Sequence, residues 1–137
     1  MMILDGKEIV MIDDDSSDLD IAKVCYQRSG LSNKFKTMRS GEDFLNYLND
    51  CADQGDNPVG LGLIDINMPL SNGFEIISRI RQDERFKHFP HFVILSNSDS
   101  HKDRDTSIKI GASEFFSKPT SVQEYVEIFN YLAKKYS

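Results

Sequence analysis

The chain has 137 residues, of which 39% are hydrophobic, so it suits one domain whose core needs no disulfide or metal cross-link. Sixteen basic and 22 acidic residues give a net charge of −6 at pH 7, which disfavours binding to nucleic acid. The apolar runs fall far short of the roughly 18 residues of a membrane span and no secretory signal is visible, so we expect a soluble, cytoplasmic, single-domain protein without a membrane partner.

Hydrophobic periodicity predicts a buried strand at residues 8–12, followed by a helix that Gly30 is placed to end. One stripe of that helix contains Ile21, Val24, Cys25 and Arg28. Cys25 is therefore expected in the core. The other cysteine, Cys51, forms no CxxC motif with it, and the pair indicates no disulfide framework.

A weaker strand is predicted at about residues 34–39. Ser40 and Asp43 resemble a capping box that starts the next helix. The buried stripe of this helix is expected to contain Phe44, Leu45 and Leu48. Residues 49–60 are polar and rich in turn-forming residues, which is typical of a surface loop.

The second half of the chain continues the same alternation. Strands are predicted at residues 61–66, 92–95 and 113–117. The helix between the first two is marked by Phe74, Ile77, Ile80 and Arg81. A polar helix at about 99–110 ends at Gly111, and a last helix follows a Ser121–Glu124 capping box. Its apolar face contains Val122, Tyr125, Phe129, Leu132 and Tyr136.

Five strands and five helices in strict alternation predict an α/β fold, a doubly wound (βα)5 parallel sheet with helices on both faces. The common strand order for such a sheet is 2-1-3-4-5. We expect a single domain over 1–137, with its core at about 8–136 and no output domain after it.

Polar side chains gather where the predicted strands end. Ligands of such sheets bind beyond the carboxyl ends of the strands, where the strand order reverses. Asp13, Asp14 and Asp65 are expected there, with Ser96 after the fourth strand and Lys118 after the fifth. One edge of the sheet would therefore present three carboxylates, a hydroxyl and an amine.

Three close carboxylates repel one another unless positive charge is supplied. A divalent cation together with Lys118 would balance them, and oxygen ligands of this kind suit Mg²⁺. Such a site is suited to phosphoryl transfer, in which positioning and charge neutralisation do most of the work.

The motifs at the strand ends form a set whose members are Ile12-Asp13-Asp14, Leu63-Ile64-Asp65-Ile66-Asn67-Met68-Pro69, Gly73, Ile94-Leu95-Ser96, Gly111-Ala112, Phe115 and Lys118-Pro119. Each has an ordinary structural explanation by itself, but the set in this order resembles the response regulator receiver domains, the CheY-like family. The resemblance covers about Glu8 to Tyr136. Within the family, the chain resembles the small stand-alone receivers that serve hybrid or phytochrome-like kinases.

The resemblance implies a role for each residue of the set. Asp65 would be the phosphoacceptor, which takes its phosphoryl group from a histidine kinase or a histidine phosphotransfer protein. Asp13, Asp14 and Asp65 would hold Mg²⁺ or Mn²⁺ together with the backbone carbonyl of Asn67. Ser96 and Lys118 would contact the phosphoryl group.

The resemblance also implies a switch. Phe115 would turn inward on activation and alter a protein-interaction face made by the fourth helix, fifth strand and fifth helix. Asn97 and Ser98 would modulate access to the phosphoryl group, because Asn97 is larger than the small residue usual in the family. A downstream protein would bind the altered face, and a homodimer is a further assembly that the resemblance allows.

Three other functions compete with this interpretation. A dehalogenase-type phosphatase would need an acid two residues after Asp65, where this chain has Asn67, so turnover of an external substrate is not expected and the chain is not interpreted as an enzyme. A flavodoxin-like protein would need a Ser/Thr- and Gly-rich phosphate loop after the first strand, which this chain lacks. A degenerate receiver that binds proteins without phosphorylation is the main alternative, but it would be expected to have lost part of the set.

Overall fold

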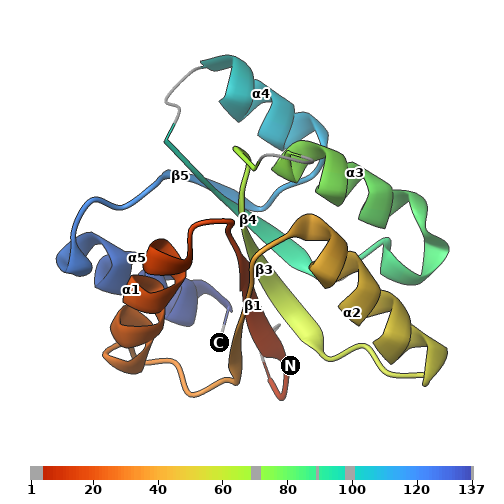
Figure 1. The fold of residues 1–137 in the computed structure, drawn as a ribbon, viewed down its shortest axis with the longest axis horizontal. Coiled ribbons are helices and arrows are strands. Elements are labelled where there is room, and N and C mark those ends of the chain that lie inside the picture. Colours follow the sequence, from red (N-terminus) through yellow and green to blue (C-terminus); the bar gives the residue numbers. More distant parts are fainter. Residues whose placement is uncertain (1–4, 69–71, 89, 98–100, 137) are drawn as a thin grey trace.

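The protein is described by a computed structural model, which covers residues 5–68, 72–88, 90–97 and 101–136. Five parallel strands form one sheet in the order β2-β1-β3-β4-β5, which confirms the predicted fold class and strand order (Figure 1). The strands are β1 (Glu8–Ile12), β2 (Phe35–Met38), β3 (Val59–Asp65), β4 (His91–Ser96) and β5 (Glu114–Ser117). The helices are α1 (Ser16–Gln27), α2 (Gly41–Asp53), α3 (Gly73–Gln82), α4 (His101–Lys109) and α5 (Val122–Tyr136), with a 3₁₀ turn η1 (Glu84–Phe86) after α3.

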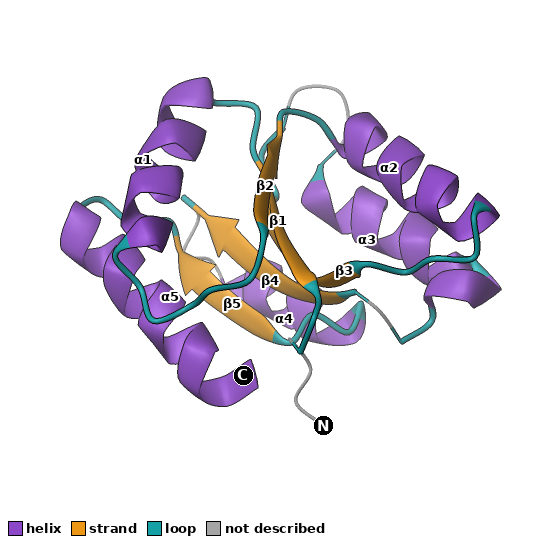
Figure 2. Ribbon diagram, turned by 90° about the horizontal axis from the view of Figure 1, so that it is seen from below, coloured by secondary structure: helices purple, strands orange, loops and turns teal. Residues whose placement is uncertain are grey.

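The sheet separates two apolar cores. Side chains alternate between the faces along β1: Ile9 and Met11 pack in the core beneath α1 and α5, and Val10 and Ile12 pack in the core beneath α2 and α3. Figure 2 shows α1 and α5 on one side of the sheet and α2 and α3 on the other. The central strands are therefore apolar at nearly every position, because both of their faces are covered.

The inward face of α1 differs from the predicted stripe. Cys25 is buried as expected, but Ile21 and Val24 are exposed. The buried residues of α1 are Leu19, Ala22, Cys25 and Tyr26. The helix carries apolar residues on two overlapping stripes, and packing against the sheet and α5 selects the one that contains Leu19.

The predicted loop at 49–60 is wrong at both ends. Helix α2 continues to Asp53, and β3 begins at Val59. The last turn of α2 looks like a loop in the sequence because its outer face is polar. Gly62 lies inside β3, where an added Cβ would come within 3.1 Å of the Phe92 ring, so packing against β4 explains a glycine in this strand.

Polar caps fix the starts of several helices. The side chains of Ser40 and Ser121 accept hydrogen bonds from the backbone amides of Asp43 and Glu124, both at 3.1 Å, which is the serine half of each predicted capping box. Asp15 caps α1 in the same way. Residues 98–100, at the start of the predicted polar helix, lie outside the described residues. Within the part of the chain that the structure describes, no helix is long and apolar enough to cross a membrane.

Candidate functional site

The ends of β1 and β3 bring two carboxylates together. Ile12 pairs with Ile64 in the parallel ladder, so the next residues, Asp13 and Asp65, lie level at the carboxyl edge of the sheet. Both are buried, with exposed fractions of 1% and 4%. One oxygen each from Asp13, Asp14 and Asp65 lies within 4.8 Å of the others. The three carboxylates therefore lie close together, as the sequence predicts.

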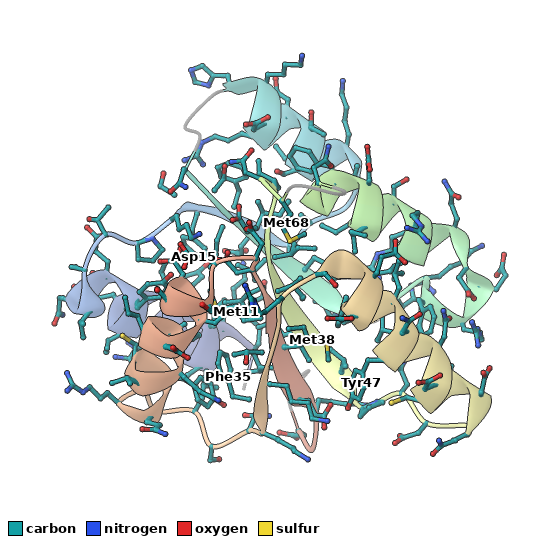
Figure 3. All side chains as sticks on the ribbon, in the orientation of Figure 1. Met11, Asp15, Phe35, Met38, Tyr47 and Met68 are labelled. Atoms are coloured by element: carbon teal, nitrogen blue, oxygen red, sulfur yellow. The ribbon has the colours of Figure 1, made fainter. Side chains whose placement is uncertain are left out.

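The side-chain view shows which end of the sheet holds this cluster. In Figure 3, Asp15 and Met68, which follow β1 and β3, lie towards the same end of the molecule. Phe35 and Tyr47 lie towards the opposite end. The acid cluster is therefore at the edge where ligands of doubly wound sheets bind.

Lys118 supplies positive charge to this edge. Its backbone amide donates to the carbonyl of Ser96 at 2.7 Å, which fixes the turn after β5 beside the end of β4. Its Nζ lies 2.8 Å from Oδ2 of Asp13 and 3.3 Å from Oδ2 of Asp65. The predicted amine is thus in contact with two of the three carboxylates.

Backbone amides occupy one oxygen of each buried carboxylate. Oδ1 of Asp13 accepts from the amide of Asp15, and Oδ1 of Asp65 accepts from the amide of Asn67, both at 3.0 Å. Oδ2 of Asp13 is buried and accepts no hydrogen bond from the described residues by distance and angle, and its ion-pair contact is the Lys118 ammonium at 2.8 Å. A buried carboxylate oxygen with spare acceptor capacity, beside two further carboxylates, fits a hard divalent cation.

Burial and neighbouring charges shift the pKa values of Asp13 and Lys118. Burial raises the pKa of Asp13 above its ordinary value, and the neighbouring Lys118 ammonium only partly offsets this. Burial alone would lower the pKa of Lys118, but its interactions with Asp13 and Asp18 outweigh burial and hold that pKa well above its usual range. Lys118 therefore stays charged, and repulsion from Asp65 adds a smaller contribution to the raised pKa of Asp13.

The other predicted residues lie around this cluster. Ser96 is fully buried at the end of β4, one residue beyond the Asp65–Leu95 pair of the ladder. Phe115 is half-buried on β5, and the guanidinium carbon of Arg104 lies 4.7 Å from its ring centroid. Asn67 and Asn97 are exposed, and Ser98 lies outside the described residues.

Asp18 is a site residue that the sequence did not identify. It lies in the first turn of α1, and its Oδ2 is 2.6 Å from Nζ of Lys118, closer than either buried carboxylate. An acid in the first turn of a helix is ordinarily explained by the helix dipole, so the sequence offered no signal for this ion pair. Lys118 is consequently shared by three carboxylates instead of two.

Comparisons with known proteins agree with this geometry. Residues 9–130 match the model of the response regulator receiver domain. The response regulator GtcR of Aneurinibacillus migulanus is 29% identical over 121 residues, which are 88% of this chain and 45% of GtcR. The chain spans about half the length of the first curated relatives that it matches.

Solved structures give the same result for the fold. Response regulator RPA3017, from red light signalling of R. palustris, is 29% identical with a TM-score of 0.80, over 92% of this chain and 90% of that one. The Mn²⁺-bound form of response regulator Rcp1 is 19% identical with a TM-score of 0.78, over 93% of this chain and 92% of that one. On the match to the family model, the chain belongs to the response regulator receiver domain family.

Proposed function

We propose that this receiver domain accepts a phosphoryl group on Asp65 as part of a two-component phosphorelay. The observation that carries the proposal is the buried Asp65 carboxylate, held beside Asp13, Asp14 and the Lys118 ammonium at one edge of the sheet. A fixed carboxylate next to a cation-binding cluster and a fixed ammonium is suited to phosphoryl transfer.

The proposed reaction is an in-line displacement. A carboxylate oxygen of Asp65 attacks the phosphorus of a phosphohistidine, the new O–P bond forms as the P–N bond breaks, and the bonding electron pair leaves with the imidazole nitrogen. Lys118 and the hydroxyl of Ser96 would then contact the phosphoryl oxygens. The amide of Asn67 already donates to Asp65 and keeps its carboxylate oriented.

Asp13, Asp14 and Asp65 would hold a divalent cation, Mg²⁺ or Mn²⁺, with the backbone carbonyl of Asn67 as a further ligand. When bound, the cation supplies charge neutralisation for the phosphoryl oxygens. The buried Oδ2 of Asp13, which accepts no hydrogen bond from the described residues, supports this assignment, as does the Mn²⁺-bound form of response regulator Rcp1. The backbone around Asp13 and Asp65 orients the ligands before the cation arrives.

The partners follow from the chemistry. A sensor histidine kinase or a histidine phosphotransfer protein would be the donor. The names of two solved response regulators, one from red light signalling and one of a bacteriophytochrome, favour a light-sensing kinase. A stand-alone regulator is part of this proposal. We propose that the protein lies in the cytoplasm with such kinases. Asn97 and Ser98 would modulate access to the phosphoryl group.

The signal would leave through the face made by α4, β5 and α5. Phe115 on β5 would couple the site to this face by turning inward. A groove of about 440 Å³ along β5 and α5 and the exposed Ile108 on α4 offer apolar surface to a downstream protein or to a second copy of the chain. Groove residues include Phe116, Pro119, Ile128 and Tyr131.

The test is phosphorylation by a small donor. The protein is incubated with acetyl phosphate with and without Mg²⁺, and the modified residue is mapped by mass spectrometry. The adduct is expected on Asp65 only when Mg²⁺ is present, and Asp65→Asn should abolish it. Asp56→Asn removes an exposed carboxylate from the loop before β3 and should leave the labelling unchanged. Labelling of Asp65→Asn at the wild-type level would refute the assignment.

A further inference from the structure

The Lys118 ammonium lies closer to Asp18 and Asp13 than to Asp65, the proposed phosphoacceptor. Its Nζ lies 2.6 Å from Asp18, 2.8 Å from Asp13 and 3.3 Å from Asp65. The Lys118 side chain is 8% exposed and that of Asp18 is 30% exposed, so water screens the pair only in part. The shortest contact of the ammonium is thus with a residue outside the acid cluster.

Both partners of this ion pair are held in place. Asp18 belongs to the first turn of α1, where its amide donates to the capping Asp15 side chain at 3.3 Å. Lys118 is fixed by the bond from its amide to Ser96, on the other side of the site. The pair therefore links α1 to the turn between β5 and α5, and the ammonium cannot leave Asp18 without rotation of its own side chain.

Asp18 is not one of the clustered carboxylates. The oxygens that come within 4.8 Å of one another belong to Asp13, Asp14 and Asp65. Asp18 therefore acts on this edge through Lys118. Its negative charge offsets part of the positive potential that Lys118 presents to Asp65, and a phosphoryl group on Asp65 requires that potential.

We propose that Asp18 is a positioning residue that holds the Lys118 ammonium towards α1 and thereby limits how tightly the site binds a phosphoryl group at Asp65. This inference rests on the proposed function of Asp65. Loss of the Asp18 carboxylate frees one donor of the ammonium and removes a negative charge from the vicinity of the phosphoryl oxygens. The ammonium would still have Asp13 and Asp65 as ion-pair partners.

The experiment measures the affinity for beryllofluoride, a phosphoryl mimic, at saturating Mg²⁺. Asp18→Asn should bind the mimic about three- to tenfold more tightly than the wild-type protein, as expected for one partly screened charge. Asp18→Ala, which removes the side-chain shape as well as the charge, should change the affinity in the same direction, because the effect comes from the charge. The concentration of acetyl phosphate that gives half-maximal labelling should fall in parallel.

Two control variants separate this effect from a general change in charge. Asp20→Asn removes an exposed carboxylate from the same helix, two residues away and on a different side of it, and should bind the mimic like the wild type. Asp18→Glu keeps a carboxylate within reach of Lys118 and should restore wild-type affinity. A merely structural role for Asp18 would not tighten binding.

The outcomes are distinguishable. If Asp18→Asn binds the mimic no more tightly than Asp20→Asn, or more weakly than the wild type, Asp18 does not restrain Lys118. If the wild-type protein itself does not bind beryllofluoride at Asp65, the phosphoacceptor assignment fails, and the inference about Asp18 fails with it. Tightening in both Asp18→Asn and Asp18→Ala, with no change in Asp20→Asn, supports the proposal.

Discussion

At the scale of single residues, Gly73 sets how closely α3 approaches the proposed phosphoacceptor. It is the first residue of α3, and its amide donates to the carbonyl of Ile66 at 3.2 Å. A Cβ at this position would lie 2.9 Å from the carbonyl oxygen of Asp65 and 3.1 Å from the Cα of Ile66. Both of these atoms belong to the backbone, so they cannot move aside as a side chain would.

Gly73→Ala is therefore expected to displace the end of β3. We expect it to lower the free energy of unfolding by about 1–3 kcal/mol, the usual effect of overpacking, and to slow labelling of Asp65 by acetyl phosphate. Chemical denaturation measures the first effect and timed mass spectrometry the second. Gly30→Ala is the matched control, because its Cβ would meet no atom within 4 Å. Equal stability and equal labelling rates for the two variants would contradict this account of Gly73.

The site residues differ in how well the sequence could predict them. Asp13, Asp65 and Lys118 could be placed together because parallel strands end at one edge of a sheet, which topology alone determines. Asp18 could not be placed there. Its contact with Lys118 depends on the path of α1 relative to the turn after β5, and the hydrophobic pattern of α1 carries no information on that path.

At the scale of helices and strands, the type and order of the elements could be predicted, but several faces and ends could not. The central strands β1, β3 and β4 are recognisable because both of their faces are buried. Helix α1 carries two apolar stripes, and only its packing on the sheet and α5 shows that Ile21 and Val24 are exposed. The polar last turn of α2 resembles a loop in the sequence for the same reason. Tertiary contacts determine where this helix ends, and a local sequence pattern does not contain them.

Helix α4 is the element best suited to respond to the proposed phosphorylation of Asp65. Among its described residues only Ser107 is buried, and Ile108 is 75% exposed, so little apolar packing holds the helix in place. Arg104 lies over the ring of Phe115 and connects α4 to β5. A rotation of Phe115 would therefore disturb a contact that holds α4 against the sheet.

We expect beryllofluoride with Mg²⁺ to change amide hydrogen exchange from α4 through β5 to the start of α5. The coupling free energy should be in the usual range of about 1–3 kcal/mol, so the exchange rates should change measurably without unfolding of the helix. Asp65→Asn should remove the response. Changes confined to the surroundings of Asp13 and Asp65, with none from Asp99 to Tyr125, would refute the assignment of the output face.

At the scale of the whole molecule, the acid cluster is a source of instability that a bound cation would relieve. The chain carries a net charge of −6, and three of its carboxylates lie within 4.8 Å of one another at one edge. The nearby Lys118 is shared with a fourth carboxylate, Asp18. Without a cation, the folded state therefore holds repulsion that the unfolded chain does not have, and a ligand that binds only the folded state should raise its stability.

Mg²⁺ is therefore expected to raise the melting temperature, and Asp14 is expected to be necessary for this. At 100 times the dissociation constant the gain is about 2.7 kcal/mol, or about 10 °C for a domain of this size. Asp14→Asn should lose most of the gain, yet melt above the wild type in the absence of metal, because one of the mutually repelling charges is gone. Asp56→Asn, in the loop before β3, should leave both the metal-free melting temperature and the gain from Mg²⁺ near wild type. Thermal unfolding with a chelator and with increasing Mg²⁺ measures both quantities, and a wild-type melting temperature that does not respond to Mg²⁺ would show that the three carboxylates do not form a cation site.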